Sequence, residues 1–334
     1  MSTASLSVAL PPAVPPGGVL RVVAPSGVID RERTLGGARV LRQLGFTVQL
    51  PPELIGRADL HLPYLAGSDD LRAHELEDAF ADPAVHGVVC ARGGYGAMRL
   101  FPHLNPDHLR AHPKPLIGFS DVTALHGYFA TQVGLASWHG PVLQSLPTLQ
   151  SSVRPRGEPQ HPIDALVGAI TGQWRASRLR GVDVLRPGRA QGPLVGGNLS
   201  LVHALAGSPW FPDLTGAILF LEEVGEAAYR IDRMLWSLVQ RGALRRVTAI
   251  LFGDMGGGVR DRFVSPERFG PVVRLLKAEL AEELEVPVVA GLPIGHAEHN
   301  QTLPFGTAAT LEADEAGWRL EITSAVCGGV DRIA

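Results

Sequence analysis

Five short apolar segments that alternate with segments of helical character place the strongest constraint on the fold of this chain. Apolar residues between the first two segments recur at helical spacing. Strands that alternate with helices predict a mostly parallel sheet covered by helices on both faces, which indicates a flavodoxin-like α/β domain in the first half of the chain. The segments suited to strands are residues 19–24, 46–50, 87–91, 116–119 and 135–138.

The second half of the chain differs from the first in composition and in its pattern of apolar segments. Residues 150–162 contain three prolines and little apolar content, which is typical of a linker. Beyond them, short apolar segments and the alternating stretch 318–322 predict a second α/β domain with mixed, partly antiparallel strands. We expect a flexible tail, an N-terminal domain, a linker and a C-terminal domain over residues 1–17, 18–149, 150–175 and 176–334, respectively.

The composition excludes several classes of protein. The 334 residues are 45% hydrophobic and 19% charged, as in a well-buried globular protein. A net charge of −3 gives no basic footprint for nucleic acid, and no apolar run approaches the ~18 residues that span a bilayer. The N-terminus resembles a ragged tail rather than a secretory signal, since no Lys or Arg precedes its weak apolar stretch. Cys90 and Cys327 are interpreted as free thiols in a reducing compartment, so we expect a cytoplasmic protein. From the charge and the short apolar runs, we expect no nucleic-acid or membrane partner.

Ser120 lies where a strand is predicted to turn directly into a helix, within the run from Leu116 to His126. Hydrolases place a nucleophile at such a turn, because the side chain is exposed and the helix N-terminus favours developing negative charge. The run is not the G-x-S-x-G elbow. Ser120 or Asp121 could equally cap the helix.

A serine nucleophile needs a general base and a group that orients the base. Glu222 ends the apolar strand of residues 217–221, and His296 follows the strand of residues 286–290. All three lie at predicted strand ends, where α/β sheets gather their sites. Alone, Glu222 could be a solvated strand end and His296 a turn residue. Together the three residues favour a Ser–His–Glu arrangement.

The segment Arg92-Gly-Gly-Tyr-Gly96 follows the third predicted strand. Its glycines would let backbone N–H groups approach a bound group closely, as a phosphate cradle or an oxyanion hole. A tight strand-to-helix turn is the structural alternative. Neither nucleotide-binding glycine motif occurs in the chain, which argues against a nucleotide cofactor.

The 12 histidines raise the question of a metal site. The chain has no H-E-x-x-H and no pair of C-x-x-C motifs. His296 with His299 is the one pair suited to metal binding, whereas the histidines at 103, 108 and 112 are interpreted as surface residues. We expect neither a metal nor a cofactor.

Several motifs in the same order resemble those of the LD-carboxypeptidases, serine peptidases that trim murein peptides in the bacterial cytoplasm during peptidoglycan recycling. The resemblance runs from about Leu20 to the C-terminus without the linker. The motifs are Tyr64-Leu-Ala-Gly-Ser-Asp-Asp-Leu-Arg72, Ala91-Arg-Gly-Gly-Tyr-Gly96, Ile117-Gly-Phe-Ser-Asp-Val-Thr-Ala-Leu-His126, His139-Gly-Pro141, Gly196-Gly-Asn-Leu-Ser200, Leu221-Glu-Glu-Val-Gly-Glu226, Tyr229-Arg-Ile-Asp-Arg-Met-Leu235 and Gly295-His296.

The resemblance implies which residues catalyse the reaction and how the domains and subunits assemble. The triad falls on Ser120, His296 and Glu222. Glu222 is preferred to Glu223, and strand alternation sends these two side chains to opposite faces. The implied oxyanion hole uses backbone N–H groups of Asp121 and of Gly93 or Gly94. The resemblance also implies that the two domains meet at the site and that the protein is a homodimer.

The implied reaction is hydrolysis of the bond between an L-configured centre and a terminal D-alanine in a murein tetrapeptide. The candidates for binding the substrate are Arg92, Tyr95 and Arg230, the two arginines as cations for its terminal carboxylate.

Two alternatives remain from the sequence. One is the microcin-immunity branch of the same family, which cleaves peptidyl or aminoacyl nucleotide amides. That branch is distinguished by the absence of Arg-Gly-Gly-Tyr-Gly after the third strand. Trp138 or Trp174 could stack on a nucleobase, although packing explains both. The other alternative is a non-catalytic peptide-binding protein whose triad is vestigial.

Overall fold

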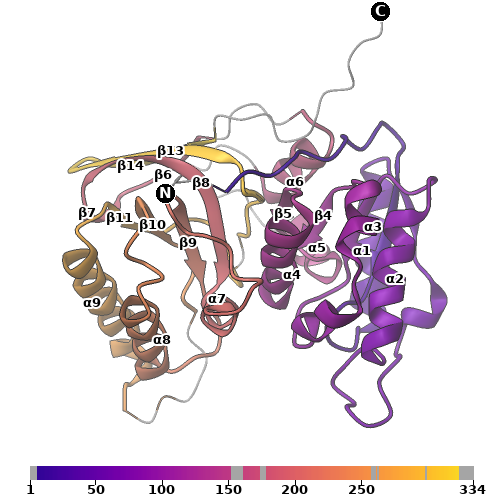
Figure 1. The fold of residues 1–334 in the computed structure, drawn as a ribbon, viewed down its shortest axis with the longest axis horizontal. Coiled ribbons are helices and arrows are strands. Elements are labelled where there is room, and N and C mark those ends of the chain that lie inside the picture. Colours follow the sequence, from indigo (N-terminus) through magenta and orange to yellow (C-terminus); the bar gives the residue numbers. More distant parts are fainter. Residues whose placement is uncertain are drawn as a thin grey trace, which may run out of the picture.

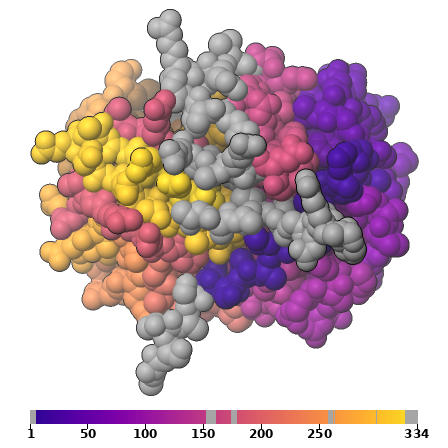
Figure 2. Space-filling model, turned by 90° about the horizontal axis from the view of Figure 1, so that it is seen from above, coloured from indigo at the N-terminus to yellow at the C-terminus, as the bar shows by residue number. Residues whose placement is uncertain are grey.

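The computed structural model describes residues 6–151, 161–173, 178–256, 261, 263–297 and 299–322. They form two α/β domains that lie side by side (Figures 1 and 2). The predicted fold class is confirmed. No helix among the described residues is long and apolar enough to cross a bilayer.

The first sheet has the strand order β12-β5-β4-β3-β1-β2. Its five N-terminal strands pair in parallel in the order 2-1-3-4-5, which is the flavodoxin-like arrangement. β12 (Leu303–Phe305) comes from the other half of the chain and pairs antiparallel with β5. The parallel strands are β1 (Val19–Val23), β2 (Thr47–Gln49), β3 (Gly87–Cys90), β4 (Leu116–Gly118) and β5 (Ser137–His139).

Helices cover both faces of this sheet because successive strand side chains point to opposite faces. In β1, Leu20 and Val22 belong to one buried cluster, and Val23 belongs to the other. The first cluster includes residues of α1 (Arg31–Gln43), α5 (Leu146–Ser151) and α6 (Pro162–Ile170). The second includes residues of α2 (Asp69–Ala81), α3 (Pro106–Ala111) and α4 (Thr123–Tyr128).

The second sheet has the order β6-β14-β13-β8-β9-β10-β11-β7. The run β8 to β11 is parallel, and the outer strands pair antiparallel. The strands are β6 (Arg178–Gly181), β7 (Asp183–Arg186), β8 (Gly188–Asn198), β9 (Ile218–Glu222), β10 (Ala249–Phe252), β11 (Val288–Ala290), β13 (Ala308–Asp314) and β14 (Gly317–Ile322).

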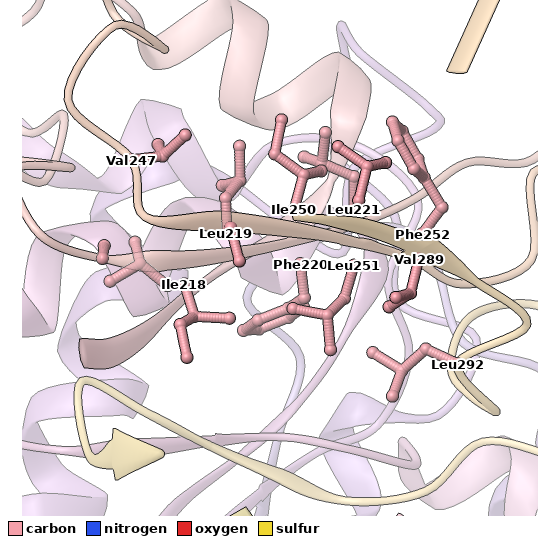
Figure 3. Close-up of a cluster of buried hydrophobic side chains, with 14 of the residues drawn as sticks. Ile218, Leu219, Phe220, Leu221, Val247, Ile250, Leu251, Phe252, Val289 and Leu292 are labelled. Carbon is pink, nitrogen blue, oxygen red and sulfur yellow. The ribbon is translucent and has the colours of Figure 1, made fainter. Parts of the chain in front are cut away.

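Helices α7 (Leu199–Leu205), α8 (Ala228–Gln240) and α9 (Pro266–Leu284) lie along one side of the second sheet (Figure 1). Figure 3 shows the side chains of β9 alternating, with Leu219 and Leu221 on one side and Phe220 on the other. Every residue of β9 and β10 is buried, as expected for parallel strands covered on both faces.

Parts of the expected tail and of the expected linker pack on the domains. Residues 6–16 were expected to be part of a flexible tail, but Leu6 and Val8 pack against the core of the second domain. Ala9 pairs with Leu135, and Val14 is 1% exposed in the core of the first domain. Apolar side chains suited to both cores explain this packing. α6, within the predicted linker, also packs on the first domain through Ile163.

Candidate active site

Ser120 lies two residues after the end of β4 and has a φ of 63°. Among the described residues, Glu285 is the only other non-glycine residue with a positive φ. The left-handed conformation is costly for a residue with a Cβ, and such strain collects at functional sites. A 3-10 turn begins at Ser120 and continues into α4, as the strand-to-helix prediction required.

Ser120, His296 and Glu222 form a chain of hydrogen-bonding side chains across the two domains. His296 Nε2 lies 3.1 Å from Ser120 Oγ, and His296 Nδ1 lies 2.8 Å from Glu222 Oε2. With a proton on Nδ1, the ring donates to the carboxylate and Nε2 can accept the serine proton. The arrangement can therefore activate a hydroxyl for nucleophilic attack.

The carboxylates of Glu222 and Glu223 have different partners, as expected when strand alternation sends the two side chains to opposite faces. Glu222 is fully buried at the end of β9, and burial raises its pKa against the opposing effect of the His296 contact. The Glu223 carboxylate instead accepts from Asn198 Nδ2 at 3.0 Å, and from the backbone N–H and Oγ of Ser200 at 2.8 and 2.7 Å. Glu223 thus stabilises the N-terminus of α7, where a negative charge is favoured.

A glycine makes the close approach of His296 to Glu222 possible. Gly295 has a φ of 112°, and a Cβ there would lie 3.0 Å from both Cβ and Oε2 of Glu222. Its N–H donates to Asn300 Oδ1 at 3.1 Å, which fixes the loop after β11. The His296 ring also packs against Phe119, with 4.8 Å between ring centroids. The loop, Glu222 and Phe119 therefore hold the imidazole from several sides.

The backbone of Gly93 lies against Ser120. A Cβ on Gly93 would be 2.8 Å from Ser120 Cβ and 3.3 Å from the backbone nitrogen of Asp121. The buried Asp121 carboxylate accepts from the N–H of Ala97 at 2.9 Å, so it ties the glycine loop to the serine turn. Burial raises the pKa of Asp121. The backbone of Gly93 and Asp121 borders the same space as the serine hydroxyl.

Ser120 and His296 open into a cavity of about 340 Å³, which Gly93, Gly94 and Arg92 also line. Arg92 Nη1 donates to the carbonyl oxygen of Val28 at 2.8 Å. The cavity includes a second cation that sequence reasoning missed, Arg33, whose Nε donates to the Gln144 carbonyl oxygen at 3.3 Å. Arg33 lies in the first turn of α1 after β1, at the carboxyl edge of the sheet, and this position was the available signal.

The other two candidates for substrate binding lie elsewhere. Tyr95 lines a neighbouring hollow that shares Arg92 and Gly94 with the cavity, and its ring meets Tyr64 edge-on at 5.8 Å. Arg230 does not line the cavity. Its Nη1 donates to Glu226 at 3.2 Å on the exposed surface of α8.

No cluster of three or more His, Cys, Asp or Glu side chains suited to a metal occurs in the described part of the chain. Cys90 is buried in the first domain, and burial raises its pKa. Cys327 and Trp174 lie outside the described residues.

Two family models match the chain: the LD-carboxypeptidase N-terminal domain over residues 20–140 and the LD-carboxypeptidase C-terminal domain over residues 191–311. A Streptomyces coelicolor protein, named as a carboxypeptidase, is 39% identical over 91% of this chain and 93% of its own length. The chain belongs to the LD-carboxypeptidase family. By family it is a serine carboxypeptidase.

Proteins with names of both branches are similar to this chain. The murein tetrapeptide carboxypeptidase of Pseudomonas aeruginosa is 33% identical over 91% of this chain and 96% of its own length. The structure of a muramoyltetrapeptide carboxypeptidase from Oxalobacter formigenes has a TM-score of 0.77 at 28% identity, covering 92% of this chain and 99% of its own. The microcin C7 self-immunity protein of Escherichia coli is 26% identical over 87% of this chain and 88% of its own length.

Proposed function

We propose that this protein is an LD-carboxypeptidase that removes the terminal D-alanine from L,D-linked murein tetrapeptides, with Ser120 as nucleophile. The observation that carries the proposal is the hydrogen-bonded chain from Ser120 through His296 to the buried Glu222, set at a strained turn that opens into a cavity. The names of the murein-acting relatives support the choice of substrate.

In the proposed reaction, Ser120 Oγ attacks the carbonyl carbon of the scissile amide while His296 Nε2 takes the hydroxyl proton. Glu222 holds the ring in the required tautomer and stabilises its charged form. His296 then gives the proton to the leaving amine, so D-alanine departs and an acyl ester remains on Ser120. Water, deprotonated by His296, attacks the ester and releases the tripeptide.

The tetrahedral intermediate carries an oxyanion that needs hydrogen-bond donors. We assign this role to the backbone N–H groups of Asp121 and of Gly93 or Gly94. The support is the close approach of Gly93 to Ser120 and to the Asp121 nitrogen. Each such donor contributes about 2.7–4 kcal/mol of transition-state stabilisation in a comparable enzyme.

A carboxypeptidase must recognise a free terminal carboxylate, for which an arginine is the usual partner. Arg92 and Arg33 line the cavity with Ser120, whereas Arg230 does not. We therefore assign the carboxylate to Arg92, with Arg33 as a second cation. Tyr95 is kept as a candidate at the adjoining hollow.

The second candidate function is hydrolysis of a peptidyl or aminoacyl nucleotide amide. The 26% identity with the microcin C7 self-immunity protein over most of both chains favours it. The glycine segment Arg92-Gly-Gly-Tyr-Gly96 supports the murein substrate instead.

The test is release of D-alanine from a defined L,D-linked tetrapeptide, compared with hydrolysis of an acyl-sulfamoyl adenylate. We expect turnover of the tetrapeptide, labelling of Ser120 by a fluorophosphonate, and full activity in a chelator. Preferential hydrolysis of the adenylate would support the immunity-type activity. Undiminished tetrapeptide turnover by Ser120→Ala would refute the assignment of the nucleophile, and binding without turnover of either substrate would favour a vestigial site.

We further propose a cytoplasmic homodimer that meets its substrate as a free peptide, without nucleic acid or membrane. Cell fractionation tests the location, and light scattering on the purified chain tests the dimer. The division into domains at residues 18–149 and 176–334 stays a proposal, and limited proteolysis within the linker 150–175 tests it.

A further inference from the structure

The sequence motif from Tyr64 to Arg72 has no part in the proposed reaction. It leads into α2, which begins at Asp69. The motif ends at Arg72, whose side chain is completely buried. An arginine is almost never fully buried unless its charge is paired. Arg72 lines neither the catalytic cavity nor the hollow beside Tyr95, so its protein partners rather than a substrate must explain its burial.

Four groups accept hydrogen bonds from the buried guanidinium of Arg72. Its Nε donates to the carbonyl oxygen of Gly67 at 3.0 Å. Its Nη1 donates to the carbonyl oxygens of Pro25 and, at 3.0 Å, of Gly96. Its Nη2 forms an ion pair with Asp69. The planar fork of an arginine suits such a divided task, and it joins the loop after β1, the loop after β3 and the start of α2.

The two loops held by Arg72 also fix the position of Gly93. Gly96 has a φ of 123°, and a Cβ there would lie 3.0 Å from Arg72 Nη1, so the guanidinium reaches the main chain of the glycine loop closely. In the loop after β1, the N–H of Gly27 donates to the carbonyl oxygen of Gly93 at 3.3 Å. The backbone of Gly93 in turn lies against Ser120. Arg72 is therefore connected to the serine through the main chain alone.

The carboxylate of Asp121 holds the same loop from the side of the serine turn. Its Oδ2 accepts from the N–H of Ala97 at 2.9 Å, while Arg72 donates to the carbonyl oxygen of Gly96. These two groups belong to one peptide unit, and they point in opposite directions when that unit is trans. Burial raises the pKa of Asp121, and the charge of Arg72 acts against this rise. A single peptide group is thus held at its oxygen by a buried cation and at its nitrogen by a buried anion.

We propose that Arg72 is a positioning residue for the oxyanion hole: with the Asp121 carboxylate it clamps the peptide group between Gly96 and Ala97, and it thereby fixes the Gly93 backbone against Ser120. This inference rests on the proposed function, because it presumes the oxyanion hole assigned there. Fixed donors stabilise an oxyanion because they need no reorientation when the charge forms. The clamp should therefore act on kcat and leave KM nearly unchanged.

A purely structural anchor of α2 is the alternative, and Arg57 shows what such an anchor looks like. Its Nε donates to the carbonyl oxygen of Ala66 at 2.7 Å, and its guanidinium forms an ion pair with Glu75 of α2. Within the described part of the chain, no hydrogen bond joins Arg57 to the loop of residues 92–97. Arg57 and Arg72 therefore differ in their contact with the glycine loop, although both hold α2 through an acidic side chain and a main-chain carbonyl group.

The experiment compares Arg72→Met with Arg57→Met. Two rates are measured, D-alanine release and labelling of Ser120 by a fluorophosphonate, which loses fluoride to the serine and places a phosphoryl oxygen in the oxyanion hole. We expect Arg72→Met to lower kcat and the labelling rate by about 10²-fold each, with little change in KM. Arg57→Met should keep both rates, although it loses stability.

Two further variants separate positioning from folding. Arg72→Met leaves the Asp121 charge buried without its partner, which is costly. Arg72→Met/Asp121→Asn removes both charges, so it should unfold at a higher urea concentration than Arg72→Met, and its kcat should still be about 10²-fold low. Arg72→Lys keeps the charge without the fork, and it should fold and lose kcat by a smaller factor. All rates are expressed per folded molecule, counted by complete fluorophosphonate labelling.

The outcomes separate the two proposals. Parallel losses of kcat and labelling rate in the Arg72 variants, at unchanged KM, support the clamp. Wild-type kcat per folded molecule in the double variant or in Arg72→Lys overturns it, and so does an equal loss of kcat in Arg57→Met. If the wild type reacts with the fluorophosphonate but releases no D-alanine, the proposed function fails, and the labelling rates of the variants still decide whether Arg72 positions the loop.

Discussion

The region around Ser120 and the region around Glu222 and His296 build their parts of the site differently. In the first, backbone geometry dominates: Ser120 has a positive φ, and Gly93 brings its main chain against the serine. In the second, side chains reach in from a strand end and a loop, joined by a 2.8 Å hydrogen bond. The comparison indicates that the first region tolerates little change of backbone, whereas the second depends on the chemistry of two side chains.

Ser120→Ala should cause the largest effect, a loss of turnover on the order of 10⁵-fold or more, because it removes the proposed nucleophile. Ser120→Gly should be as inactive but more stable than Ser120→Ala by about 1 kcal/mol, since glycine relieves the positive φ. D-alanine release and urea unfolding measure the two effects. Equal stability of the two variants would contradict backbone strain at this turn.

Glu222→Gln and Glu223→Gln form a matched pair in the second region. Glu222→Gln should lower kcat by about 10⁴-fold with little change in KM, because the imidazole loses its partner and its correct tautomer. Glu223→Gln should keep activity but lower the free energy of unfolding by about 1–3 kcal/mol, as hydrogen bonds at the N-terminus of α7 are lost. Steady-state kinetics and urea unfolding separate these results, and a large loss of kcat in Glu223→Gln would contradict the division of roles.

Gly93→Ala tests whether the region around Ser120 tolerates a change of backbone. Its Cβ would lie 2.8 Å from Ser120 Cβ, so the loop must move and kcat should fall by about 10²-fold. Gly45→Ala is the control, because Gly45 has a φ of 94° and open space around it. That variant should lose about 1 kcal/mol of stability and keep its kcat. Equal kcat in the two alanine variants would show that the region tolerates a shifted loop.

We expect the smallest effect from replacing the buried His126, which lies next to the serine turn. This change should alter stability alone. Burial lowers the pKa of His126 to about 4, below its unfolded value of about 6.5. Between these values the unfolded chain binds the proton and the native protein does not, so the free energy of unfolding falls as the pH falls. His126→Gln should flatten this dependence by roughly 1.4 kcal/mol per pH unit. Urea unfolding at pH 7, 6 and 5 measures the slope, and an unaltered slope would contradict a neutral buried ring.

The five parallel strands and the serine turn were predictable because their signals are local. Each strand is a short apolar run that ends at polar, glycine or proline residues, and Ser120 comes just after one of these runs. β12 was not predicted, since three residues with a central proline give no strand signal and its pairing with β5 spans about half of the chain. Arg33 was missed for a related reason. Its surroundings are made by residues distant in sequence, and a lone cation on a helix is usually solvated.

The pairing of β12 with β5 has a consequence for how the protein is made. The first sheet needs Leu303–Phe305 to cover the edge of β5. During synthesis, residues 6–170 leave the ribosome long before that strand exists, so the edge beside His139 stays uncovered until residues 303–305 have emerged. His296 arrives only seven residues ahead of the covering strand. The nascent chain therefore acquires its hydrolytic centre and the strand that covers β5 almost together.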